Sequence, residues 1–393
     1  MPINGIIWAY KGYNFIKFNV KNDICICLND SCRLKVLFLH YHNGCNKNVD
    51  NNKKDILFII NPKSGVHGKR SLPKLIESGI DRSSINFSIK ETEYVGHASE
   101  LAREAVSQGV YAVVAVGGDG TVNEVARAIV GSGCSLGILP CGSGNGMARH
   151  LGVPMDLKRA VEFINTAQSV SVDYGKINGR HFFCTCGIGF DALVSSNFAN
   201  SKHRGPLGYM QNMLVDWLNY KPEVYEVETE THTEKYKAFL IACGNAAQYG
   251  NNAYIAPRAS MRDGLLSVTI LEPFSSLDVP IVLGHVFGHR INSNSHVKTL
   301  ETRWIRIKRK NDGVVHFDGE PAMMEAELFI EIVPSGLNVL ASPSWDGTSA
   351  PVPIYKQIVE LMRSSLPTVS DFPTLPPLPP LPPLPWRGDK EKE

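Results

Sequence analysis

Short apolar runs alternate with amphipathic stretches between residues 55 and 169. The runs at 56–60, 111–116 and 136–139 lack polar alternation, which is typical of parallel strands buried on both faces. A further strand is expected at 86–92, and stretches with helical spacing of apolar residues follow the strands. Strands that alternate with helices predict an α/β domain with a mainly parallel sheet over residues 55–169.

The pattern changes after Val170. Short runs rich in β-branched and aromatic residues then dominate, and helical stretches interrupt them at 206–219 and 278–288. We therefore expect a second, β-sandwich-like domain over residues 170–345, with the active site in the cleft between the two domains. Its strands are expected at 170–177, 180–186, 223–230, 236–243, 265–271, 302–309, 313–317 and 326–333.

The two ends of the chain fit neither pattern. Residues 1–54 are expected to be a flexible extension that ends in an Asn- and Lys-rich linker at 43–54. Residues 346–393 form a Pro-rich tail with a Leu-Pro-Pro repeat, whose leucines would share one stripe of a polyproline II helix. A solvated low-complexity tail is favoured over a peptide ligand for SH3- or WW-like domains.

Composition narrows the class of protein. The 393 residues carry a net charge of +2, which argues against a nucleic-acid partner. No apolar run approaches the ~18 residues of a membrane-spanning helix, and the N-terminus lacks a signal-peptide core. The nine cysteines include no Cys-x-x-Cys pair, so neither a metal site nor disulfides are expected of them. These features predict a cytoplasmic protein whose contact with membranes, if any, is peripheral.

A glycine-rich loop follows the strand at 111–116. Gly117, Gly118 and Gly120 surround Asp119 immediately before a helical pattern, and such a loop at a helix N-terminus favours phosphate binding. Asp119 would repel phosphate, so we expect it to hold a magnesium ion or to orient a reacting hydroxyl group. Thr121 and Glu124 have the spacing of a capping box, which predicts that the helix begins beside Thr121.

Three other motifs accompany this loop in a fixed order. They are Asn61–Gly65, Leu139–Asn145 and Phe317–Pro321. Together with Gly-Gly-Asp-Gly-Thr and the following Asn-Glu, they resemble the diacylglycerol kinase catalytic family, which includes bacterial lipid kinases and the sphingosine and ceramide kinases. The resemblance covers about residues 55–342 and implies a lipid kinase that uses ATP and Mg²⁺. It implies an ATP site lined by Asn61, Pro62, Lys63, Ser64, Gly65, Thr92, Gly117, Gly118, Asp119, Gly120, Thr121, Val122, Asn123 and Ser143.

The resemblance also implies roles for individual acids. Glu320 matches the proposed general base of bacterial members, and Asp119 is the rival base. Asp191 is similar in position to an acid that contacts the lipid headgroup in sphingosine kinases, although a helix N-cap is equally compatible. The acceptor would be diacylglycerol or a sphingoid long-chain base at a membrane surface, and a homodimer is compatible with this interpretation.

A second implied site would hold magnesium. Ser260, Asp263 and Leu265 match the magnesium ligands of bacterial members, and Asp173 would support them through water. Gly146 departs from the bacterial pattern, which has an aspartate after the loop asparagine.

Two alternatives remain open from the sequence. An NAD kinase-like phosphotransferase would share the glycine loop, and a non-catalytic lipid- or nucleotide-binding protein would share the fold. A basic and aromatic strip at 303–310, together with Lys202–Arg204, is either a solvated strand face or a docking surface for anionic lipid.

Overall fold

The computed structural model describes residues 5–10, 13–18, 24–28, 34–38, 53–64, 71–200, 220–353 and 356–357. The chain divides into two compact units, Met1–Asn52 and Lys53–Glu393. Several predicted features lie outside the described residues. They are Gly65, the helix at 206–219, the basic residues Lys202–Arg204 and the Leu-Pro-Pro repeat of the tail.

The first unit forms an antiparallel sheet. Its described strands are paired in the order β1-β2-β3-β4, so each strand lies beside its neighbour in sequence. This segment was expected to be flexible, and the strands are therefore an addition to the predicted organisation. Their bounds are Gly5–Tyr10 (β1), Tyr13–Phe18 (β2), Ile24–Leu28 (β3) and Leu34–Phe38 (β4).

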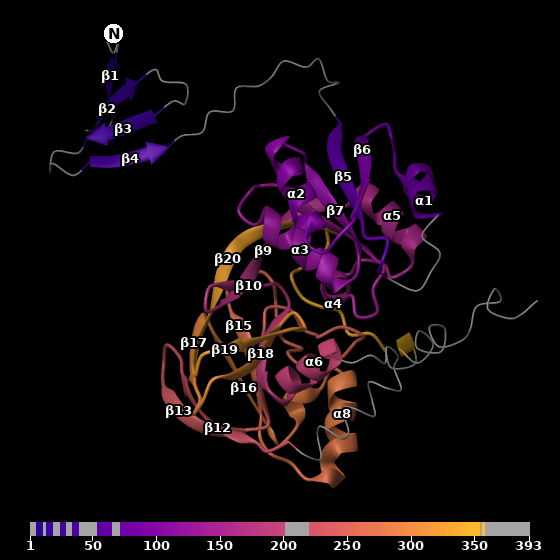
Figure 1. Cartoon of the computed structure of the whole chain (residues 1–393), viewed down its shortest axis with the longest axis vertical. Coiled ribbons are helices and arrows are strands. Elements are labelled where there is room, and N and C mark those ends of the chain that lie inside the picture. Colours follow the sequence, from indigo (N-terminus) through magenta and orange to yellow (C-terminus); the bar gives the residue numbers. More distant parts are fainter. Residues whose placement is uncertain are drawn as a thin grey trace, which may run out of the picture. The chain divides into compact units, whose positions relative to one another are not determined.

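The second unit begins with the predicted α/β domain. Its four parallel strands are ordered β8-β7-β5-β6. Helices α2 and α3 pack together on one side of this sheet, and α1 and α5 pack together on the other (Figure 1). The elements are β5 (Lys54–Ile60), α1 (Leu72–Gly79), β6 (Ile85–Glu91), α2 (His97–Ser107), β7 (Ala112–Gly117), α3 (Asp119–Ile129), β8 (Ser135–Pro140), α4 (Gly146–His150) and α5 (Leu157–Thr166).

The rest of the second unit is the predicted β-sandwich-like domain. A sheet ordered β16-β15-β14-β11-β18-β19 faces the antiparallel strands β13-β12-β17-β20, and a buried apolar cluster fills the space between them. Helices α6 and α8 cover the other face of the first of these sheets, over a separate apolar cluster. None of the described helices is long and apolar enough to cross a bilayer.

Most predicted strands are present, with differences at several places. The expected strand at 236–243 is divided at Phe239, where the chain passes from one sheet (β13) to the other (β14), and the expected strand at 180–186 is divided into β10 and β11. The strands β16 and β19 were not predicted. The elements are β9 (Gln168–Ile177), β10 (Arg180–Phe182), β11 (Thr185–Gly189), α6 (Phe190–Asn200), β12 (Glu223–Glu228), β13 (Thr233–Ala238), β14 (Leu240–Gly244), β15 (Leu266–Leu271), η2 (Ser276–Asp278), α8 (Val279–Phe287), η3 (Ile291–Ser293), β16 (Val297–Thr302), β17 (Trp304–Lys308), β18 (Gly313–Phe317), β19 (Glu320–Met324) and β20 (Glu327–Ala341).

Strand β20 joins the two domains into one continuous sheet. It was expected to end at residue 333, but it continues to Ala341 and pairs in parallel with β8. A bulge between Val333 and Leu337 bends the strand where it passes from one domain to the other. Asp173 stabilises this bend, because its carboxylate accepts the N–H of Ser335 at 2.7 Å.

A buried histidine also fastens the two domains. His150, at the end of α4, is 1% exposed. Its Nδ1 accepts the N–H of Ala247 at 3.1 Å, and its Nε2 lies 3.0 Å from the carbonyl oxygen of Gly347. This arrangement requires the neutral ring with the proton on Nε2. Burial lowers the pKa of His150 from 6.5 to about 4, although the Gly347 carbonyl and Asp346 oppose the shift.

We expect this histidine to make the fold sensitive to acid. The neutral form is favoured in the folded state, so its contribution is present above pH 6.5 and is lost as the pH falls towards 4. A lowering of the pKa of His150 from 6.5 to about 4 corresponds to about 3 kcal/mol of unfolding free energy. His150→Gln keeps one donor and one acceptor but does not titrate. Denaturant unfolding at pH 7 and pH 4.5 should therefore show that the free energy of unfolding falls less in the variant than in the wild type. An equal fall in both proteins would contradict the assignment.

Candidate active site

Three loops meet at the carboxyl edge of the parallel sheet. They follow the adjacent strands β5, β7 and β8, whose C-terminal ends lie side by side. The N–H of Asn61 donates to the carbonyl of Val116 at 3.0 Å, and the N–H of Cys141 donates to the carbonyl of Gly117 at 2.8 Å. The structure thus brings together three predicted motifs: the start of Asn61–Gly65, the glycine loop around Asp119, and Leu139–Asn145.

Glycine is required for packing at some positions of these loops and not at others. A Cβ on Gly142 would lie 2.5 Å from the Cα of Gly118, and a Cβ on Gly117 would lie 2.6 Å from Oγ1 of Thr121. These glycines are required because backbone and side chains pass too close for a side chain. A Cβ on Gly120 would meet no atom within 4 Å. Gly120 is exposed in the first turn of α3, so a side chain there would extend into open space.

Helix α3 begins earlier than predicted. Its first residue is Asp119, and its N-cap Gly118 makes no side-chain capping hydrogen bond. The predicted capping box is therefore wrong. Thr121 lies inside the first turn and accepts from Nδ2 of Asn61 at 3.0 Å, while Glu124 accepts the N–H of Gly96 at 3.1 Å.

The carboxylate of Asp119 joins two of the loops. Its Oδ2 accepts the N–H of Asn145 and its Oδ1 accepts the N–H of Gly146, both at 2.8 Å. These are the first amides of α4, so the carboxylate caps that helix and complements its dipole. Burial raises the pKa of Asp119, and the two N–H groups partly oppose this. The sequence motif did not reveal these partners, because they come from a loop 26 and 27 residues away.

The loop after β8 is held in shape by its own asparagine. Asn145 adopts a left-handed conformation with φ of 50°. Its side-chain amide donates to the carbonyl of Gly142 at 2.7 Å and accepts the N–H of the same residue at 2.9 Å. Ser143 is consequently presented at the exposed tip of the loop. Gly146 stands where the bacterial pattern has aspartate, and a Cβ there would lie 3.1 Å from the carbonyl oxygen of Tyr249, a tight contact.

The other residues expected at an ATP site are placed around the same edge. Pro62 and Lys63 are exposed, and the N–H of Lys63 donates to the side chain of Asn61 at 2.9 Å. The remaining members of the set are buried: Thr92 at the end of β6, and Val122 and Asn123 in α3. Val122 belongs to the apolar core, so only its backbone is available to a ligand. Ser64 lies at the edge of the described loop, where its hydroxyl donates to the carbonyl of Asn61.

Glu320 follows a tight hairpin between β18 and β19. Asp318 and Gly319 both have positive φ, at 53° and 79°, between the paired residues Phe317 and Glu320. This is the geometry of a two-residue type I′ turn, for which Asp-Gly is a preferred sequence. The turn places Glu320 at the first position of β19 and fixes its backbone.

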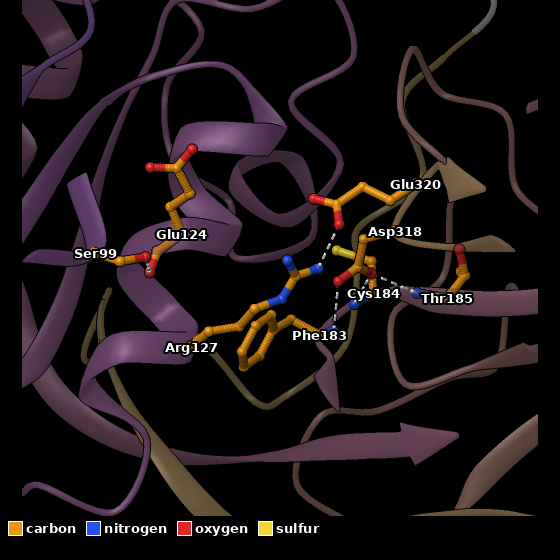
Figure 2. A network of polar contacts seen from close by, with 8 residues as sticks. All are labelled: Ser99, Glu124, Arg127, Phe183, Cys184, Thr185, Asp318 and Glu320. Atoms are coloured by element: carbon orange, nitrogen blue, oxygen red, sulfur yellow. Dashed lines mark hydrogen bonds and ion pairs between the residues drawn. The ribbon is translucent and has the colours of Figure 1, made fainter. Parts of the chain in front are cut away.

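Asp318 is an acid that the sequence analysis did not assign. It is half-buried, and its carboxylate accepts the N–H groups of Phe183, Cys184 and Thr185 at 2.7 to 3.1 Å (Figure 2). Burial raises the pKa of Asp318 to about 6, although these N–H groups and the charge of Arg127 oppose the shift. The Asp-Gly hairpin signal could have located the residue but not its partners.

An ion pair joins helix α3 to the hairpin. Nη2 of Arg127, on α3, lies 3.0 Å from Oε2 of Glu320 (Figure 2). The thiol of Cys184 is buried beside the hairpin, and burial raises its pKa.

Asp191 lies at the start of α6 and is nearly buried. Its Oδ2 accepts from the hydroxyl of Tyr249 at 3.0 Å and lies 2.9 Å from Nε2 of His316, and its Oδ1 accepts the N–H of Ala192 at 2.8 Å. The acid therefore has protein partners on both oxygens. Gly187 is required beside it, because a Cβ there would collide with Oδ2.

The predicted magnesium loop is built around two acids. Oδ1 of Asp263 accepts the N–H of Leu265 at 3.0 Å, and Ser260 pairs with Thr348 in a β-bridge. Asp173 binds the loop directly, by accepting the N–H of Gly264 at 2.8 Å, and not through water alone as expected. Burial raises the pKa of Asp263, and the charges of Asp173 and Glu301 raise it further.

Both expected cofactors fit the chemistry of these residues. The open space beside Gly120 adjoins the N-terminus of α3, which favours a phosphate group. At the second loop, a hard cation would relieve the repulsion between Asp263, Asp173 and Glu301. Within the described ranges, no three His, Cys, Asp or Glu side chains are grouped closely enough to hold a metal ion by themselves. Backbone oxygens or phosphates would have to complete the coordination.

Comparison with known proteins agrees with this geometry. The profile of the Diacylglycerol kinase catalytic domain matches residues 55–177, and that of the YegS C-terminal NAD kinase beta sandwich-like domain matches residues 184–341. The resemblance to the diacylglycerol kinase catalytic family is therefore confirmed at the level of these two domains.

Curated relatives can be aligned with about 70% of this chain. A probable lipid kinase YegS-like of Yersinia enterocolitica is 27% identical over 73% of this chain and 97% of its own length. That of Chromohalobacter salexigens is 29% identical over 69% of this chain and 88% of its own. The crystal structure of a diacylglycerol kinase from Bacillus anthracis has a TM-score of 0.59 at 21% identity, and covers 74% of this chain and 98% of that one. The predicted fold is confirmed.

The basic and aromatic strip at 303–310 makes contacts within its own sheet through Arg306. Arg306 pairs with Glu228 at 2.7 Å and with Glu327 at 3.2 Å. Its guanidinium also lies over the rings of Trp304 and Phe329. These contacts favour the strand-face interpretation over a docking surface for anionic lipid.

Two glycine substitutions should separate packing from ligand binding. Gly142→Ala forces a Cβ onto backbone and should lower stability by about 1–3 kcal/mol. Gly120→Ala enters open space in a helix, so its stability should be unchanged or about 1 kcal/mol higher. The same Cβ narrows the space beside the α3 amides and should weaken ATP binding. Thermal unfolding and equilibrium ATP binding measure the two effects, and tight ATP binding by Gly120→Ala would contradict the placement of the phosphates.

Proposed function

We propose that this protein transfers the γ-phosphoryl group of ATP to a hydroxyl group of a lipid. The observation that carries the proposal is the sharing of α3 by two functional parts. The N-terminus of α3 carries the glycine loop, and Arg127 of the same helix binds Glu320 at 3.0 Å. One rigid element thus relates the phosphate-binding loop to the candidate base.

The geometry supports a role for each part in phosphoryl transfer. The amides of the first α3 turn would bind the phosphates, with Ser143 and Thr92 at the rim of the same site. Glu320 would take the proton of the lipid hydroxyl. The hydroxyl oxygen forms a bond to the γ-phosphorus, the bond to the bridging oxygen breaks, and ADP leaves with that electron pair.

Magnesium would contribute charge neutralisation to the phosphates when bound. We propose that Asp263, with the backbone of Ser260 and Leu265, forms the protein part of a magnesium site. Asp173 holds that loop in shape through the N–H of Gly264. Asp119 accepts N–H groups from Asn145 and Gly146 in the loop after β8, so we assign it the positioning of the two phosphate-binding loops.

The acceptor class is the finer part of the proposal. We propose that Asp191 recognises the polar head of the acceptor together with Tyr249 and His316. A carboxylate can accept about four hydrogen bonds, so its three protein partners leave it capacity for a ligand. A sphingoid base would place an ammonium near this acid, whereas diacylglycerol would place a neutral ester. We further propose that the protein works at a membrane surface from the cytoplasm.

Glu320→Gln should separate binding from chemistry. The amide keeps the size and the polar contact of the side chain but cannot take a proton, so kcat should fall about 10²- to 10⁴-fold. Equilibrium ATP binding should not change. Turnover of labelled ATP with a lipid panel measures the effect, and NAD is included as an acceptor to test the NAD kinase alternative. A wild-type kcat in the variant would remove Glu320 as the base.

The variant Asp191→Asn should distinguish between the two classes of lipid acceptor. If the carboxylate binds the ammonium of a long-chain base, kcat/KM for that substrate should fall at least about tenfold more than kcat/KM for diacylglycerol. Tyr249→Phe is the matched control, because it removes a donor to Asp191 and leaves the charge. Equal losses of Asp191→Asn on both lipids would show that the acid is structural.

A further inference from the structure

One ion pair connects the two parts of the proposed site. Arg127 and Glu320 are 193 residues apart in sequence and come from the α/β domain and the β-sandwich-like domain. Their side chains are 30% and 42% exposed, so the pair is only partly buried. A pair of this exposure contributes little to stability. We therefore ask how the ion pair affects the geometry of the site.

The guanidinium of Arg127 is held in place independently of Glu320. It lies over the ring of Phe317, with 5.6 Å between its carbon and the ring centroid. Its backbone is fixed in the last turns of α3, and helical side chains lean towards the N-terminus, here towards the glycine loop. The charge also acts on Asp318, whose pKa it lowers. Arg127 is therefore a preorganised cation that faces the hairpin carrying Glu320.

Glu320, in contrast, has only its backbone fixed by the hairpin. The type I′ turn and the pairing with Phe317 set the start of β19, while the side chain remains partly exposed with several rotatable bonds. The ion pair uses Oε2 and leaves Oε1 available. Binding to Arg127 thus selects one orientation of the carboxylate.

We propose that Arg127 is a positioning residue for the phosphoryl transfer, which aims Oε1 of Glu320 at the acceptor hydroxyl. This inference rests on the proposed role of Glu320 as base. Misplacement of a catalytic group by about 1 Å can lower a rate by about 10²-fold. Arg127 would therefore act on kcat through Glu320, without contact with ATP or lipid.

Three single variants test the role. Arg127→Gln should lower kcat about 10- to 100-fold while the KM values for ATP and lipid change less than about twofold. Arg127→Lys retains the charge and should recover a large part of kcat. Arg180→Gln is the matched control. Arg180 also lies over the Phe317 ring, at 5.8 Å, but makes no ion pair with Glu320 in the described part of the chain, so its kcat should be unchanged.

A double-mutant cycle distinguishes this inference from the proposed function. If Arg127 acts through Glu320, adding Arg127→Gln to Glu320→Gln should lower the residual kcat less than about twofold. An equal loss in both backgrounds, or a rise in the KM for ATP in place of a fall in kcat, would overturn the positioning role. A wild-type kcat in Arg127→Gln alongside an inactive Glu320→Gln would overturn it and leave the base assignment intact. A wild-type kcat in Glu320→Gln would instead overturn the base.

Discussion

The close approach of two glycine loops, joined by the carboxylate of Asp119, is the constraint on which the site depends. A Cβ on Gly142 would lie 2.5 Å from the Cα of Gly118, so the two loops pass too close for a side chain at position 142. The carboxylate then binds the N–H groups of Asn145, the N-cap of α4, and of Gly146, its first residue, at 2.8 Å each. A charge-assisted contact of this kind is strong, and loss of one partner would leave buried polar groups unpaired. These contacts therefore hold the loops after β7 and β8 together.

Helix α3 extends this constraint to the second domain. Its first turn carries the open space beside Gly120, and its last turns carry Arg127. Strand β20 supplies the second connection, because it is shared by the parallel sheet and the sandwich. A helix and a shared strand are both rigid elements. They explain how loops from two domains can be held at the separation that a transfer reaction needs.

The loop after β8 also contacts the segment around Tyr249. A Cβ at position 146 would lie 3.1 Å from the carbonyl oxygen of Tyr249, and the hydroxyl of Tyr249 donates to Asp191. This segment thus contacts the loop after β8 with its backbone and Asp191, the candidate acceptor-binding acid, with its side chain.

Local features of the molecule could be predicted from the sequence by itself. The unbroken apolar runs determined the parallel strands, and the glycines around Asp119 determined the loop, because periodicity and turn chemistry depend on neighbouring residues. The Asp-Gly pair likewise determined the turn before Glu320. The tertiary structure alone decided the partners of Asp119 and Asp318, the passage of β20 into the parallel sheet and the pair of Arg127 with Glu320. Each joins residues that are far apart in the chain, and only the packing of strands and helices brings such residues within hydrogen-bond distance.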